Sequence, residues 1–184
     1  MRRQLILLSV IVAVGFFLGT SQASAVPVDL TTFTPSPEEV VLIALDGSSA
    51  TLGEDENNAP VSLVNLAFQI PSNALSFSFD YALVVASANE DYFDFYFADQ
   101  SNPIFSVGGV EDSYSGSYNL NVTPFRGDQI PIIFGLSYGW DDIGYDSTLT
   151  ISNVEINPVP EPATLFLMSA GLAGLMGLRR KFYS

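Results

Sequence analysis

Aromatic residues alternate with polar ones in two segments near the middle of the chain, and this period of two constrains the fold more than any other feature. In residues 75–81 every second side chain is apolar, and residues 92–97 carry phenylalanine at every second position. Successive side chains of a β-strand point to opposite faces, so each segment predicts a strand with one apolar face. The predicted core residues are Leu75, Phe77, Phe79, Tyr81, Phe93, Phe95 and Phe97.

Six further apolar or alternating segments bring the number of predicted strands to about eight. They lie at residues 40–45, 61–70, 104–107, 118–122, 130–138 and 148–156, separated by clusters of glycine, proline and asparagine. Helical periodicity is scarce, and the spacing suits two packed sheets better than alternating strands and helices. We therefore predict an all-β fold over residues 26–157, a single β-sandwich of the jelly-roll type.

The last of these predicted strands changes phase part-way along. Leu149 and Ile151 share one face, whereas Val154 and Ile156 fall on the other. A β-bulge at residues 152 and 153 would return all four side chains to the core. The sequence therefore predicts a bulge at that point.

Charge is strongly segregated along the chain. Residues 26–157 hold 19 acidic residues and one basic residue, Arg126, which gives a formal charge of −18. Such a surface repels the phosphate backbone, so nucleic acid is excluded as a partner. The chain has no cysteine and no histidine, which removes disulfides and the common catalytic triads. A glycan hydrolase that uses paired carboxylates is the remaining enzymatic alternative, but no acidic residue stands out, and we predict that the protein is not an enzyme.

The first 25 residues have the three parts of a secretory signal peptide. Arg2 and Arg3 precede the apolar residues 5–18, and the stretch ends with Ala23 and Ala25 on either side of a serine. This order predicts export and cleavage by signal peptidase after Ala25. An uncleaved membrane anchor is the alternative, and the polar residues 20–22 favour cleavage.

The C-terminal residues 158–184 combine a short motif, an apolar run and a basic end. The motif is Pro160, Glu161 and Pro162; apolar residues 163–178 follow it, and then Arg179, Arg180 and Lys181. Sixteen residues are somewhat short of the roughly 20 that span a bilayer, so the predicted transmembrane helix is marginal. Basic residues at both ends of the chain place those ends on the cytoplasmic side and the domain between them on the other side of the inner membrane.

This tail resembles the PEP-CTERM sorting signal of Gram-negative bacteria that produce exopolysaccharide. In that family a membrane-embedded exosortase is thought to cleave at or near the motif and to pass the protein to the cell surface. The resemblance implies that Pro160, Glu161 and Pro162 are the recognition element and that Arg179, Arg180 and Lys181 form the basic stop. The alternative is a single-pass membrane protein that keeps its tail.

A second resemblance covers roughly residues 60–156. The alternating segment 75–81, the strand start at Asp91 and the closing segments around residues 140–142, 146–147 and 151–154 resemble the jelly-roll domains that often precede PEP-CTERM tails. Those domains resemble carbohydrate-binding modules. Related domains often have aspartate where Ser152 stands, and this departure weakens the transfer of a calcium site to the final strand.

Two sets of residues near position 140 have the chemistry of a binding site. Asp141, Asp142 and Asp146 lie close together in the sequence, and clustered carboxylates are ligands that calcium prefers. These residues therefore predict a structural calcium site. The alternative is an acidic loop that is solvated and binds no metal. Trp140 and Tyr145 can offer flat rings to a sugar, or they can pack in the core. Tyr92 and Tyr96 form another possible platform, for which cross-strand pairing is the simpler role.

Together these patterns predict an exported surface or extracellular-matrix protein that is sorted by an exosortase. Its β-sandwich is predicted to have a binding or structural role, with exopolysaccharide as the candidate ligand. The alternative is an uncleaved, membrane-anchored periplasmic protein that binds calcium or a protein partner.

Overall fold

The alternating segments of the sequence are β-strands in the computed structural model, which describes residues 24–55, 60–86, 90–110, 112–139, 146–159 and 171. These described residues form eleven strands and three short 3-10 helices. The strands are β1 (Val26–Pro27), β2 (Thr34–Ser36), β3 (Val41–Ile43), β4 (Ser49–Gly53), β5 (Val61–Gln69), β6 (Ala74–Val84), β7 (Glu90–Phe97), β8 (Phe105–Val110), β9 (Ser113–Asn121), β10 (Gln129–Tyr138) and β11 (Thr148–Pro158). The helices are η1 (Leu30–Thr32), η2 (Glu38–Val40) and η3 (Thr123–Phe125).

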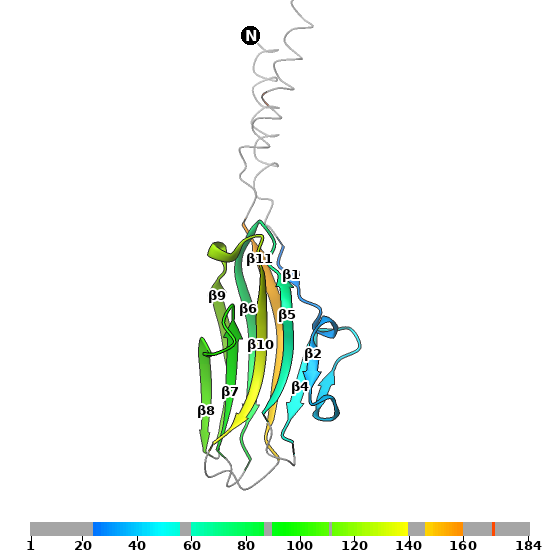
Figure 1. Cartoon of the computed structure of the whole chain (residues 1–184), viewed down its shortest axis with the longest axis vertical. Coiled ribbons are helices and arrows are strands. Elements are labelled where there is room, and N and C mark those ends of the chain that lie inside the picture. Colours follow the sequence, from blue (N-terminus) through cyan, green and yellow to red (C-terminus); the bar gives the residue numbers. More distant parts are fainter. Residues whose placement is uncertain are drawn as a thin grey trace, which may run out of the picture. The chain divides into compact units, whose positions relative to one another are not determined.

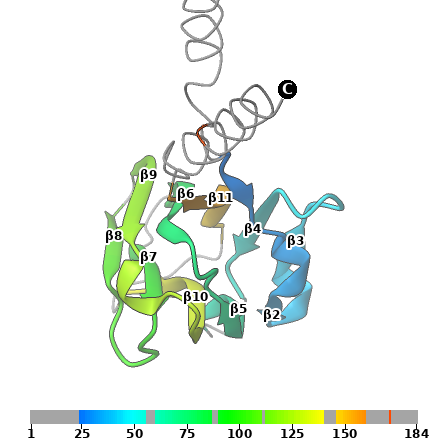
Figure 2. The same ribbon diagram turned by 90° about the horizontal axis from the view of Figure 1, so that it is seen from above.

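The strands form two antiparallel sheets that pack face to face as a β-sandwich (Figures 1 and 2). The first sheet has the order β3-β4-β11-β6-β9, and β1 pairs with β11 beside it. The second sheet has the order β2-β5-β10-β7-β8. Residues Ala25–Pro158 make up one compact unit, so the predicted all-β sandwich is confirmed.

Phenylalanine rings from both sheets fill the space between them. Phe77 of β6 stacks on Phe95 of β7 with ring centroids 5.9 Å apart, and Phe79 meets Phe134 of β10 edge-on at 5.2 Å. All four of these side chains are at most 1% exposed. Burial of such large apolar side chains, with no disulfide to help, is the main source of stability for this fold.

All eight predicted strands are present, but the sequence analysis missed β1, β2 and β4. β1 and β2 have two and three residues, and β2 contains Pro35, so neither shows a pattern that can be recognised. Leu75 was predicted to lie in the core and is 43% exposed, whereas its neighbour Ala74 is fully buried. The pairing of β6 with β11 shifts register between Asn157 and Pro158, and this shift changes which side of β6 faces inward.

The predicted bulge in the last strand is confirmed. The register between β11 and β6 shifts between Ser152 and Glu155, and Asn153 has a left-handed backbone with φ 49°. As a result Leu149, Ile151, Val154 and Ile156 are all buried.

The first and last strands of the domain lie side by side, because Val26 of β1 is paired with Ile156 of β11. The apolar residues 5–18 of the predicted signal peptide and the helix predicted at residues 163–178 lie outside the described residues, except for Gly171. In the part of the chain that the structure describes, no helix is long and apolar enough to cross a membrane.

Candidate functional site

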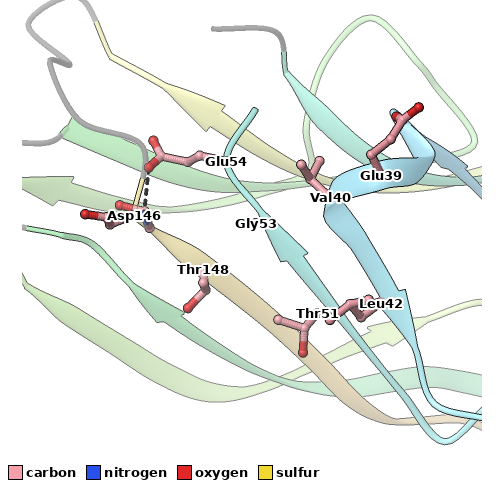
Figure 3. Close-up of a pocket in the computed structure, with 9 residues that line it drawn as sticks. Glu39, Val40, Leu42, Thr51, Gly53, Glu54, Asp146 and Thr148 are labelled. Carbon is pink, nitrogen blue, oxygen red and sulfur yellow. Dashed lines mark hydrogen bonds between the residues drawn. The ribbon is translucent and has the colours of Figure 1, made fainter. Parts of the chain in front are cut away.

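A groove of about 360 Å³ lies on the outer face of the first sheet, beside its edge strand β3 (Figure 3). Its lining residues are Glu39, Val40, Leu42, Thr51, Gly53, Glu54, Asp146, Ser147 and Thr148. Leu42 and Thr51 are paired across β3 and β4, and Thr148 is paired with Gly53 across β11 and β4. These residues reach the outer face because their neighbours Val41, Leu52 and Leu149 point into the core.

The groove combines an apolar surface with carboxylates. Leu42 is 73% exposed, and Figure 3 shows it beside Thr51, whereas Glu54 and Asp146 lie near each other at another part of the groove. None of the nine lining residues is basic. Within the described ranges, however, no three acidic side chains come close enough to hold a metal ion.

A buried polar network lies directly behind the groove. Ser147 is 1% exposed and Asp91 is fully buried, and the Ser147 hydroxyl donates a hydrogen bond of 2.6 Å to the Asp91 carboxylate. The Ser147 backbone N–H donates to the Glu54 carboxylate at 2.7 Å, and Ala86 N–H donates to the Ser147 hydroxyl at 2.8 Å. The network therefore fixes the ends of three strands, β4, β6 and β7, against the start of β11.

The outer face of the second sheet carries a different set of residues, centred on β7. Tyr92, Asp94 and Tyr96 alternate with the buried Phe93, Phe95 and Phe97. Four residues of a strand separate the two tyrosines by about 13 Å, with Asp94 between them. The two phenol rings and the carboxylate thus follow one line along the strand.

A buried glycine on the neighbouring strand packs beside this line. Gly135 of β10 is paired with Asp94, and a Cβ atom built there would lie 4.0 Å from the Tyr96 ring. Asp94 accepts a hydrogen bond of 2.6 Å from the Ser137 hydroxyl, and Tyr92 donates its hydroxyl proton to Glu90 at 2.6 Å. Aromatic rings, a fixed carboxylate and a hydroxyl on the outer face of a sheet are groups that stack on sugar rings and bond to their hydroxyls.

Both tyrosines keep their protons across the physiological range. The hydrogen bond to Glu90, with desolvation, raises the pKa of Tyr92 above its ordinary value of 10.0. Desolvation, with the negative charge of Asp94, raises the pKa of Tyr96. Each phenol therefore stays neutral.

The residues predicted from sequence are placed only in part. Asp146 lies in the groove of Figure 3, and Ala25 lies just before β1. The other predicted residues lie outside the described ones, so the calcium, stacking, signal-cleavage and sorting roles stay predictions: Ala23, Trp140, Asp141, Asp142, Tyr145, Pro160, Glu161, Pro162, Arg179, Arg180 and Lys181.

Sequence analysis missed the buried network, although one signal for it was present. Asp91 has the same phase as Phe93, Phe95 and Phe97, so strand alternation alone places this carboxylate on the core side. Its partner Ser147 carries no such signal, because it precedes β11.

Comparison with known proteins gives one sequence match. Residues 158–181 match the PEP-CTERM protein-sorting motif, and this confirms the resemblance of the tail. The motif implies an exported protein that an exosortase sorts. A search of curated proteins found no match to this sequence.

The sandwich is similar to solved carbohydrate-binding modules. CBM27-1 from Caldicellulosiruptor saccharolyticus, solved in complex with mannohexaose, has a TM-score of 0.50 at 10% identity, over 75% of this chain and 99% of that chain. TmCBM27, described as a carbohydrate-binding module that recognises mannan, has a TM-score of 0.43 at 10% identity, over 76% of this chain and 95% of that one. At such low identity the first likeness shows the jelly-roll fold alone.

Proposed function

We propose that this protein is delivered to the cell surface or the extracellular matrix and there binds polysaccharide, without catalysis, through the outer face of its second sheet. The ligand proposed is the exopolysaccharide of the producing cell. Signal peptidase would release the N-terminus after Ala25, and an exosortase would act near Pro160 while the tail is held transiently in the inner membrane.

The line of Tyr92, Asp94 and Tyr96 is the observation that carries the binding proposal. The two rings flank a carboxylate that Ser137 holds in place at 2.6 Å, and Gly135 is paired with that aspartate on the neighbouring strand. Sugar rings present flat C–H faces and many hydroxyls, so they are complementary to such a surface. The surrounding acidic residues disfavour anionic glycans, and we therefore expect a neutral or cationic polysaccharide.

The binding test compares variants of the full-length chain that lose a tyrosine ring with variants that keep the ring and lose only its hydroxyl. Tyr92→Ala and Tyr96→Ala should each weaken binding to the host's purified exopolysaccharide by roughly tenfold, in line with the loss of one stacked ring. Tyr92→Phe and Tyr96→Phe keep the ring and should bind nearly as well as the unaltered chain. Affinity electrophoresis in a gel containing the polysaccharide measures the difference.

Several results would contradict this proposal. Equal binding by the alanine variants and the unaltered chain would move the site away from β7, with Trp140 and Tyr145 as the next candidates. If the protein released reducing sugar from the polysaccharide, and replacement of one particular carboxylate abolished that release, the protein would be a hydrolase and not a binding protein.

The sorting part of the proposal is tested separately, by intact-mass analysis of the protein recovered from its host. We expect a surface or matrix form that begins at Val26 and ends near Pro160, and we expect Glu161→Ala to retain the tail in the membrane fraction. A tail on every recovered molecule would favour the alternative, an anchored periplasmic protein.

Calcium at Asp141, Asp142 and Asp146 remains a proposal of its own. If calcium is structural there, the thermal midpoint of the full-length chain should rise on addition of calcium, as expected for any ligand of the folded state. The Asp142→Asn variant should lose most of that rise.

A further inference from the structure

The edge strands of the two sheets differ sharply in how they are protected against pairing with another chain. β2 and β3 have only three residues each, and β2 contains Pro35. β8 contains Gly108 and Gly109, both with positive φ, at 156° and 153°. Short length, proline and irregular backbone are the usual devices that stop a sheet edge from acting as a template.

β9 has none of these devices. It runs for nine residues, Ser113–Asn121, without a proline and without a charged side chain. All nine residues pair with β6 in one continuous register, from Ser113 with Val84 to Asn121 with Ser76. Among the strands described here, none lies on the other side of β9.

A long regular edge presents a repeating row of backbone donors and acceptors that an added strand can use. In this chain the lack of charge on β9 is informative, because residues 26–157 carry 19 acidic residues. A second copy of so acidic a chain is repelled by most of the surface. β9 is a long edge whose own side chains add nothing to that repulsion, although the carboxylate of Asp112 accepts from the Ser113 N–H at its start.

We propose that two copies of this chain pair through β9, antiparallel and about a two-fold axis, so that the first sheets of both copies become one continuous sheet. An antiparallel strand pair is isologous, because both partners contribute the same residues. Full overlap of the nine residues places Ser117, the central residue of β9, opposite Ser117 of the second copy.

The side chains suit this register. On the outer face it sets Ser113 opposite Asn121 and Ser115 opposite Asn119, so every pair is small or hydrogen-bonding and neutral. On the inner face it sets Gly116 opposite Tyr118 and Tyr114 opposite Leu120, so those pairs are uncharged as well.

Asp80, on β6, is the acidic residue paired with Ser117. Its carboxylate accepts hydrogen bonds from the hydroxyl of Ser117 and, at 2.7 Å, from the amide of Asn153. Three strand spacings would separate the two copies of Asp80, about 14 Å. That separation exceeds the Debye length of about 8 Å at physiological ionic strength, so salt screens their repulsion.

The chain contains no cysteine, so single-cysteine variants give a direct test in the full-length protein. Ser117→Cys should form a disulfide-linked dimer on mild oxidation, because directly opposed residues of an antiparallel pair lie within disulfide range. Ser113→Cys alone should not, since its two copies would lie about 26 Å apart. A mixture of Ser113→Cys and Asn121→Cys should cross-link.

Ser106→Cys, on the exposed edge strand β8, is the matched control for random collision. We expect about tenfold more dimer from Ser117→Cys than from this control, because strand pairing raises the local thiol concentration. Equal cross-linking of the two variants, or of Ser113→Cys and Ser117→Cys, would overturn the proposal.

A second measurement needs no disulfide. The unaltered chain in detergent should have the protein mass of a dimer by light scattering, and the double variant Ser115→Lys with Asn119→Lys should have that of a monomer, since it sets like charges opposite each other. Ser106→Lys should stay dimeric. A monomeric unaltered chain at micromolar concentration would refute the pairing, whatever the outcome for polysaccharide binding.

Discussion

The Ser147 hydroxyl donates a hydrogen bond of 2.6 Å to the Asp91 carboxylate, and both residues are buried although 56 positions separate them in the chain. A buried carboxylate is costly unless hydrogen bonds replace the water that it has lost. Ser147 therefore joins the start of β7 to the start of β11 at the end of the sandwich that also holds the groove.

Removal of this hydroxyl should destabilise the fold. We predict that Ser147→Ala lowers the free energy of unfolding by about 1–3 kcal/mol, the usual cost of taking a partner from a buried polar group. Urea denaturation of the full-length chain measures the change. Ser106→Ala, at an exposed position, should change stability little, and an equal loss in both variants would show that the buried bond is not the cause.

Replacement by alanine should destabilise the fold more at Gly47 than at Gly127, a glycine of similar backbone conformation. Gly47 has φ 68°, and a Cβ atom there would collide with the Asp29 carboxylate oxygen. That carboxylate caps η1 by accepting from the Thr31 N–H at 2.9 Å. Gly127 has φ 83°, and no atom lies within 4 Å of a Cβ atom built there. Alanine at this position therefore measures the cost of the left-handed backbone conformation without a clash.

We predict that Gly127→Ala costs about 1–2 kcal/mol from the left-handed backbone alone. Gly47→Ala should cost roughly 1 kcal/mol more, because it also displaces the Asp29 cap. Denaturant midpoints of the two variants check this order. Equal losses would mean that Asp29 moves aside without penalty.

Protonation of Asp80 in acid should lower the stability of the fold. Hydrogen bonds from Asn153 and then Ser117 lower the pKa of Asp80 from its ordinary value of 3.8. A carboxyl whose pKa is lower in the folded state stabilises the fold above its unfolded pKa, and that contribution disappears as the pH falls through the folded pKa. The affected range therefore lies below a pH of about 4.

Carboxyl NMR titration tests the cause of this shift. Asn153→Ala should bring the pKa of Asp80 back toward 3.8 by removing the first of its two donors. Asn157→Ala is the matched control, since the Asn157 amide donates to Ser78 at 3.1 Å and not to Asp80. Equal shifts in both variants would contradict the assignment.

Truncation of two residues of β6 should destabilise the fold by very different amounts. Phe79 is 1% exposed and touches rings from both sheets, whereas Leu75 is 43% exposed. We predict that Phe79→Ala costs about 3–5 kcal/mol, as a large cavity in a packed core does. Leu75→Ala should cost well under 1 kcal/mol. Thermal unfolding followed by circular dichroism distinguishes the two.

Sequence predicted those parts of the fold in which alternation runs over several residues. Phe77, Phe79 and the β7 phenylalanines lie in the core as expected, and the phase change at residues 152 and 153 is a bulge. Leu75 was placed wrongly because its exposure depends on the register of β11, which no local pattern records.

The candidate site was less predictable for a related reason. Alternation within one strand predicted that Tyr92 and Tyr96 share a face, and they do. Their role as a platform, for which cross-strand pairing was the simpler interpretation, stays a prediction. The network of Asp91, Ser147 and Glu54 joins residues from β7, β4 and the start of β11. Contacts of that kind arise only when distant strands become neighbours, and a single sequence does not encode them in its spacing.

β11 leads into the sorting motif, and its position has a mechanical consequence. The strand ends at Pro158, pairs with β4 on one side and β6 on the other, and so lies inside its sheet instead of at an edge. A pull on the chain at Pro158 would act along a strand that must slide past two neighbours at once. Force applied to the C-terminal end of the domain, by the sorting machinery or by anything joined to that end, would therefore meet more backbone hydrogen bonds than force applied to an edge strand.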